Sequence, residues 1–98
     1  FSRRYEKRIW IMTLIDWYPK AREFLRKLPK NIANRIFNKV DQEIKQNVEH
    51  YLETLAGRKG YKIRVGDYRL FVDYDKNQDY LIIRAIRHRK DAYKKGKF

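Results

Sequence analysis

Lysine and arginine side chains gather on one face of a β-hairpin that the sequence predicts between residues 61 and 74. In residues 61–65, Lys62 and Arg64 alternate with apolar side chains, which is the period of a half-buried strand. A Gly-Asp turn signal follows and places Arg64 opposite Arg69 on the returning strand. Like charges directly across an antiparallel pair are destabilising. We therefore expect this cationic face to bind an anion.

Such residues could cleave RNA, because RNA carries its own nucleophile, the 2′-hydroxyl. A protein has to accept the hydroxyl proton, stabilise the pentacovalent phosphorane and protonate the leaving 5′-oxygen. Arginine and lysine donors around the phosphate meet the second requirement. Tyr93 is a candidate base if nearby cations favour its phenolate, and the alternative for Tyr93 is an anchor that packs the tail onto the sheet. His88 is another candidate acid or base, because imidazole groups exchange protons near neutral pH.

The sequence predicts neither a metal ion nor a cofactor. It contains no cysteine, and its histidines, His50 and His88, lie far apart without a cluster of carboxylates around either. A metal-dependent nuclease generally needs several convergent carboxylate ligands. The candidate aspartates are expected at strand edges and turns instead: Asp73, Asp75, Asp79 and Asp91. Two glycines around two cations at residues 57–60 could hold a phosphate, but this pattern is more often a plain turn.

Composition favours a small basic domain with a polyanionic partner. The 98 residues suffice for one domain, and 43% hydrophobic residues suffice for a modest core. The formal net charge of +13 favours nucleic acid, the ribosome or an acidic protein as the partner. We expect a cytoplasmic protein with no membrane association, because the chain has no cysteine and its apolar run at residues 9–15 is too short to span a bilayer.

The remaining pattern predicts an α+β fold, with an antiparallel sheet in the order β-α-α-β-β-β. A first strand is expected at residues 12–18, and Pro19 suits the first turn of a helix. A second helix starts after Pro29, and its apolar residues recur every four positions: Ile32, Ile36, Val40, Ile44 and Val48. This helical hairpin is expected to pack on one face of the sheet.

The last strand is expected in the apolar run at residues 80–86, after a polar turn at 75–79. If Tyr74 pairs with Tyr80, Arg69 lies opposite Ala85 and Arg87 joins the cationic face. The same alternation adds apolar side chains to this face: Phe71, Leu81, Ile83 and Ala85. A face that is both basic and apolar suits an acidic amphipathic helix of a partner protein.

The two ends of the chain are basic. Residues 1–11 are expected to form an N-terminal extension to a single domain at residues 12–98. Met12 has the character of a natural start, which would make the extension non-native or flexible, and the alternative is a basic arm that grips RNA. The short basic tail after residue 87 could form a short helix or a frayed end.

Three segments resemble the RelE/ParE toxin superfamily: LRKLP at residues 25–29, GYKIRVGDYRL at 60–70 and HRKDAY at 88–93. The resemblance spans roughly residues 12–95. The stretch at 60–70 followed by the tail at 88–93 is a fairly specific combination, and neither stretch alone would identify the family. It implies a small toxin of a type II toxin–antitoxin pair, bound by an acidic RelB-like antitoxin in a hetero-oligomer. For the RelE-like branch it implies cleavage of mRNA in the ribosomal A site without a metal ion.

Carried onto this sequence, the resemblance implies roles for single residues. Lys62 and Arg64 would grip the phosphate, and Arg69 would stabilise the transition state. Arg87 would support the leaving oxygen, and Tyr93 would be the base.

Two more residues of the tail remain open. Arg89 is a candidate auxiliary to Arg87, because the last strand and tail are spaced differently from those of the best-known bacterial members. His88 is a candidate for substrate binding or acid catalysis. Two other functions also remain open at this point: a ParE-like inhibitor of DNA gyrase, and a non-catalytic module that binds RNA or the ribosome.

Overall fold

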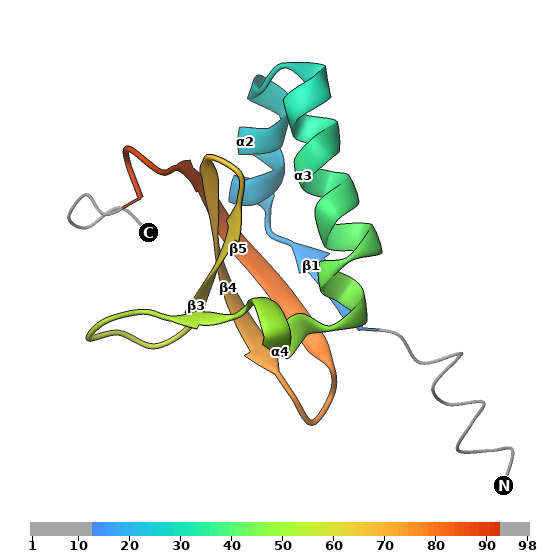
Figure 1. The fold of residues 1–98 in the computed structure, drawn as a ribbon, viewed down its shortest axis with the longest axis vertical. Helices are drawn as coiled ribbons and strands as arrows, with labels where there is room; N and C mark the ends of the chain where they lie inside the picture. The colour runs from blue at the N-terminus through green and yellow to red at the C-terminus, as the bar shows by residue number, and fades with distance from the viewer. Residues whose placement is uncertain (1–12, 93–98) are drawn as a thin grey trace, which may run out of the picture.

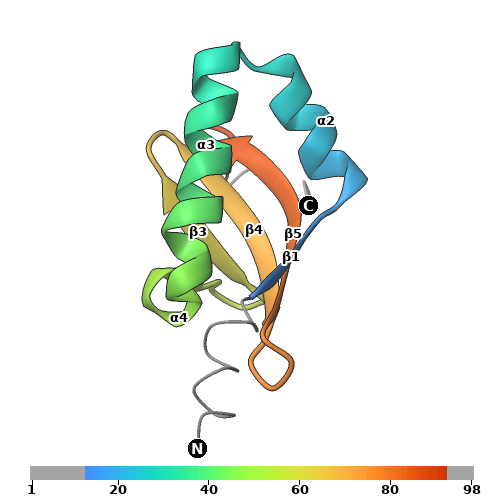
Figure 2. The ribbon, with the colours of Figure 1, turned by 90° about the vertical axis from the view of Figure 1, so that its right-hand side faces the viewer.

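A computed structural model describes residues 13–92, in which helices cover one face of a five-stranded sheet (Figures 1 and 2). The strands lie in the order β1-β5-β4-β3-β2. Their bounds are β1 Leu14–Trp17, β2 Glu53–Thr54, β3 Tyr61–Val65, β4 Tyr68–Asp75 and β5 Tyr80–His88. The predicted α+β architecture is confirmed, while the extension expected at residues 1–11 lies outside the described residues.

The sheet is mixed, and the expectation of a purely antiparallel sheet is wrong at one edge. Strand β1 pairs in parallel with β5, with Leu14 beside Tyr80 and Trp17 beside Ile83, whereas the other three pairs are antiparallel. The chain leaves β1 through the helices, so β1 and β5 become neighbours only after the meander β3-β4-β5 has crossed the sheet. Alternation along a strand predicts which side chains share a face but carries no information on the direction of a distant neighbour.

The helical hairpin consists of α2 (Pro19–Lys27) and α3 (Lys30–Gln42), and each helix begins at or just after a proline, as predicted. The second helix was expected to continue to about residue 48, but α3 ends at Gln42. A 3-10 turn η1 (Ile44–Gln46) and a short helix α4 (Val48–Tyr51) follow. The apolar spacing nevertheless continues through this break, since both Ile44 and Val48 are buried.

The main core lies between the helical hairpin and the sheet. Its fully buried members come from both layers: Ala21, Ile36, Val40, Ile44, Ile63, Leu70, Val72, Leu81 and Ile83. Burial of each valine, leucine or isoleucine side chain in this core stabilises the fold by about 1.5–3 kcal/mol. None of the helices within residues 13–92 combines the length and the apolar character needed to cross a lipid bilayer.

A β-bulge sets the register between β4 and β5. Tyr80 pairs with Asp75 rather than with Tyr74, and the register shifts between Phe71 and Val72, which face Ala85 and Ile83. Arg84 is therefore the extra residue on β5. The predicted pairing of Tyr74 with Tyr80 is wrong already at the turn, before the bulge, because Asp75 belongs to β4 and the turn is one residue shorter than expected.

The one-residue difference in register at the turn also corrects two residues of the predicted cationic face. Leu81 and Ile83 are fully buried in the core under the helices, not on the cationic face. Phe71 and Ala85 do lie on the other side of the sheet, where they form a separate cluster with Ala92. We call this side the open face, and its basic residues are Lys62, Arg64, Arg69, Arg84 and Arg87.

Candidate active site

Three arginines form one row across the open face. Arg64 on β3 pairs directly with Arg69 on β4, and Arg69 pairs directly with Arg87 on β5. The first pairing is as predicted, whereas Arg69 was expected opposite Ala85. Side chains directly opposite each other in such pairs have Cβ atoms about 4.5–5.5 Å apart, so the three arginine side chains leave the sheet side by side. This arginine row concentrates cationic hydrogen-bond donors where an anion could bind.

The central residue of the arginine row is held by the turn that precedes it. The Nη1 atom of Arg69 donates to the main-chain carbonyl oxygens of Gly66 and Tyr68, each at 3.0 Å. Arg69 is only 9% exposed, and its Nε has no hydrogen-bond partner among the described residues. A buried donor without an acceptor is costly, and a phosphate oxygen is an acceptor that would satisfy it. The guanidinium is thus fixed in place before any ligand binds.

The outer residues of the open face are more accessible. Arg64 extends into solvent, with its Nη2 atom 3.6 Å from Glu53 Oε1 on β2. Both side chains are largely exposed, so this ion pair contributes little to stability and is easily exchanged for another anion. Lys62 lies one row further along β3, directly opposite Phe71. Strand alternation therefore brings Lys62 and Arg64 to the same side as Arg69 and Arg87.

A turn after β5 folds the chain back toward the open face. The backbone amide of Arg89 donates to the carbonyl oxygen of Asp67 at 2.7 Å, and Arg89 Nε lies 3.5 Å from Asp67 Oδ1. At the end of this turn Ala92 is completely buried against Phe71 and Ala85. The turn thus covers the apolar part of the open face next to the arginine row. Tyr93 comes next in the chain but lies outside the described residues, so its role as a base stays a prediction.

His88 lies on the other side of the sheet. Its ring makes an edge-to-face contact with Tyr68, with centroids 5.2 Å apart, and its Nδ1 accepts a hydrogen bond from the Lys90 amide at 3.1 Å. Tyr68 in turn packs against Phe24 on α2. The structure therefore does not bring His88 together with the arginine row. Alternation from Arg87 would have indicated this, since neighbouring residues of a strand point to opposite faces.

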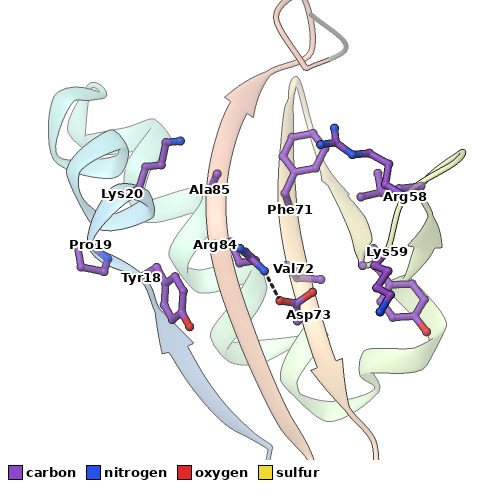
Figure 3. Close-up of a pocket in the computed structure, with 13 residues that line it drawn as sticks. Tyr18, Pro19, Lys20, Arg58, Lys59, Phe71, Val72, Asp73, Arg84 and Ala85 are labelled. Atoms are coloured by element: carbon purple, nitrogen blue, oxygen red, sulfur yellow. Dashed lines mark hydrogen bonds and ion pairs between the residues drawn. The ribbon is translucent and has the colours of Figure 1, made fainter. Parts of the chain in front are cut away.

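A groove of about 560 Å³ lies beside the arginine row on the open face (Figure 3). In its centre, Arg84 Nη1 contacts Asp73 Oδ2 at 2.7 Å. Three further cations line the walls: Lys20, Arg58 and Lys59. Sequence analysis assigned Asp73 to a strand edge and did not select Arg84. The signal for Arg84 was present, because it is the one charged residue in the run 80–86.

Within residues 13–92, no three His, Cys, Asp or Glu side chains gather closely enough to hold a metal ion. The open face instead offers arginine and lysine donors in two adjoining places, the arginine row and the groove. The donors of the arginine row are suited to a phosphate, and the groove adds a carboxylate acceptor.

Sequence comparison identifies the family. The family model described as the ParE toxin of the type II toxin–antitoxin system parDE matches residues 15–93, which is most of the chain. The chain belongs to this toxin family. It is thereby a type II toxin of the RelE/ParE superfamily, as its sequence segments indicated. No curated protein matches the sequence of this toxin.

Solved structures share the fold of the toxin. The toxin–antitoxin complex RelBE2 of Mycobacterium tuberculosis matches with a TM-score of 0.70 and 21% identity, over 80% of this chain and 99% of that chain. The RelB–RelE complex of Methanococcus jannaschii matches with a TM-score of 0.60 and 23% identity, over 84% and 99%. The intact RelBE complex of Escherichia coli matches with a TM-score of 0.60 and 19% identity, over 78% and 95%. In each of these three structures the toxin was solved in complex with an antitoxin.

Proposed function

We propose that this toxin is a ribosome-dependent endonuclease that cleaves mRNA in the A site through attack of the RNA 2′-hydroxyl. The observation that carries the proposal is the arginine row. Arg69 lies between Arg64 and Arg87 in this row, and the turn at Gly66 holds its guanidinium in place. A row of guanidinium groups suits a phosphate whose negative charge increases in the transition state. The RNA itself brings the nucleophile, so the protein has to supply charge, position and proton transfer.

Each residue of the site has a distinct role in this proposal. Arg69 donates to the nonbridging oxygens of the phosphorane, and its fixed position means that little reorganisation is needed during the reaction. Lys62 and Arg64 bind the phosphate from β3, and Arg87 stabilises the leaving 5′-oxygen from β5. Tyr93 is the proposed base, and it directly follows Ala92, the last described residue, which is buried on the open face.

The other predicted residues take auxiliary places. Arg89 is tied to Asp67 through both its backbone and its side chain, so its proposed contribution is to hold the tail rather than to contact the phosphate. The position of His88 beside Tyr68 gives it no contact with the arginine row, and its proposed role is limited to packing. We further propose that the toxin acts in the cytoplasm, and that its antitoxin is RelB-like, with an acidic amphipathic helix that neutralises the open face.

Inhibition of DNA gyrase is the second candidate, because the family model that matches the chain is described as a ParE toxin. Poisoning of gyrase requires protein–protein contact and no catalysis. The arginine row favours the nuclease, since three aligned cations with one buried donor are costly for a surface that only docks on a protein. The two candidates differ in what the purified toxin does to each target.

The test is toeprinting of a translated mRNA on purified ribosomes from a matching source, in parallel with a gyrase supercoiling assay. We expect new stops within A-site codons, and their loss in Arg69→Ala. Circular dichroism checks that the variant is folded, and Arg69→Lys serves as a second variant that keeps the charge but not the planar fork. Inhibited supercoiling with intact mRNA would instead establish the gyrase-directed activity. Intact mRNA with salt-sensitive ribosome binding would establish a binding module.

A further inference from the structure

The groove beside the arginine row has a carboxylate at its centre. Figure 3 shows Asp73 on β4 and Arg84 on β5 pointing toward each other across it. Their contact is 2.7 Å, and the side chains stay 40% and 57% exposed, respectively. The register creates this arrangement, because Asp73 pairs with Ile82 and Arg84 lies two residues further along β5, on the same side of the sheet. The pair is therefore accessible to a ligand in the groove.

The charges of the groove indicate what that ligand offers. Lys20, Arg58 and Lys59 supply positive charge from the walls, which suits a phosphate or another anion. The carboxylate of Asp73 repels an anion, and an ionised carboxylate can only accept hydrogen bonds. A ligand that uses the whole groove consequently combines negative charge with a group that donates hydrogen bonds to Asp73. A nucleotide has both properties.

The bases differ in how well they match Asp73 and Arg84. The Watson–Crick edge of guanine presents two adjacent donors, N1–H and the 2-amino group, next to the acceptor O6. Adenine presents one donor beside one acceptor, cytosine presents one donor followed by two acceptors, and uracil presents one donor between two acceptors. Only guanine therefore offers a pair of donors to a carboxylate and an acceptor to a neighbouring guanidinium. The partly exposed ring of Tyr18 lines the same groove and provides an aromatic surface for a base.

We propose that the groove binds a guanine of the mRNA next to the scissile phosphate, with Asp73 accepting from N1–H and the 2-amino group and Arg84 donating to O6. This inference rests on the proposed nuclease function and adds a base preference to it. Asp73 lies four residues from Arg69 on β4, which is about 13 Å along the strand. That separation places the groove within reach of a nucleotide near the one bound at the arginine row. Asp73 and Arg84 thereby become specificity-determining residues.

The test measures cleavage rates on ribosomes programmed with mRNAs whose A-site codons differ at one position at a time. Each position carries guanine, adenine or inosine, and inosine lacks only the 2-amino group of guanine. Within each protein, the rate for guanine is divided by the rate for adenine, so that a general loss of activity cancels. We expect a ratio on the order of tenfold at one position, with inosine in between. In Asp73→Asn the ratio should fall to about one.

A matched control removes the same charge elsewhere. Asp41 on α3 is partly exposed and pairs with Lys45 at 3.6 Å, far from the open face in sequence and in fold. Asp41→Asn should keep the guanine preference of the unmodified toxin. Because exposed ion pairs contribute little to stability, Asp73→Asn should also remain folded, and thermal unfolding of both variants checks this.

Each outcome separates the base preference from the nuclease activity. If the toxin cleaves all codons without a base preference, or if Asp73→Asn keeps the preference, the guanine site is refuted while the nuclease stands. If Asp73→Asn keeps the preference but weakens antitoxin binding, the groove is a protein-docking surface and the guanine site is again refuted. If the unmodified toxin cleaves no codon, the nuclease itself is refuted, and the guanine site with it. The inference is supported if Asp73→Asn loses the guanine preference while Asp41→Asn keeps it.

Discussion

Replacement of Gly60 by alanine should destabilise the toxin more than the same replacement of Gly57 in the same loop. Both glycines have a positive φ, +93° for Gly60 and +69° for Gly57. An added Cβ at Gly60 would lie 3.1 Å from Asp73 Oδ1 and 3.2 Å from the carbonyl oxygen of Val72, whereas at Gly57 it would meet no atom within 4 Å. The pair of variants therefore separates the cost of backbone conformation from the cost of crowding.

The expected magnitudes follow from these two environments. A side chain at positive φ costs about 1–2 kcal/mol, and this is the whole expected effect of Gly57→Ala. Gly60→Ala carries a similar conformational cost plus the contact with Val72, whose carbonyl belongs to a central strand and cannot move away easily. Overpacking of this kind adds about 1–3 kcal/mol. We expect the free energy of unfolding to fall by about 2–5 kcal/mol in Gly60→Ala.

Urea unfolding followed by far-UV circular dichroism measures both free energies. The slope of the free energy against urea concentration should stay unchanged, because neither variant alters the surface exposed on unfolding. Equal destabilisation of the two variants, within about 0.5 kcal/mol, would refute the close approach of the loop to β4.

Three other expectations concern the core and its titration. Ile83→Ala should lower the free energy of unfolding by about 2–5 kcal/mol, since Ile83 is fully buried. Leu14→Ala should change it by less than about 1 kcal/mol, since Leu14 is 65% exposed, and urea unfolding measures both. Burial and the hydrogen bond to Asp79 raise the pKa of Tyr74. The folded toxin therefore keeps this proton where the unfolded chain loses it, and stability should fall as pH rises above about 10. Unfolding of Tyr74→Phe across this pH range should show a smaller fall; an identical fall would refute the assignment.

The sequence predicted the hairpin β3–β4 and its cationic face correctly. A two-residue turn leaves little freedom in register, so the pairing of Arg64 with Arg69 followed from the Gly-Asp signal. The two prolines likewise predicted where the helices begin. These features depend on a few neighbouring residues, which is why local patterns suffice for them.

Features that depend on distant parts of the chain were predicted less well. Arg87 was expected on the open face, and it does lie there, but the pairing behind that expectation was wrong by two residues, one at the turn and one at the bulge after Phe71. Arg84 and Asp73 share the open face because Asp73 pairs with Ile82, a register that differs by one residue from the one expected at the turn. The parallel pairing of β1 with β5 is set by the path of the whole chain and not by residues in either strand.

The catalytic part of the account depends on Arg69, and the most direct test is the single-turnover rate of mRNA cleavage in the A site. Arg26 provides the matched control, because it lies exposed on α2 and pairs only at the surface with Glu23, at 3.3 Å. Removal of one fixed donor from a transition state lowers a rate by about 10²–10³-fold. We predict a loss of that size for Arg69→Ala, and a rate within about twofold of the unmodified toxin for Arg26→Ala. Equal rates for the folded Arg69→Ala variant and the Arg26→Ala variant would contradict the assignment of the arginine row as the catalytic centre.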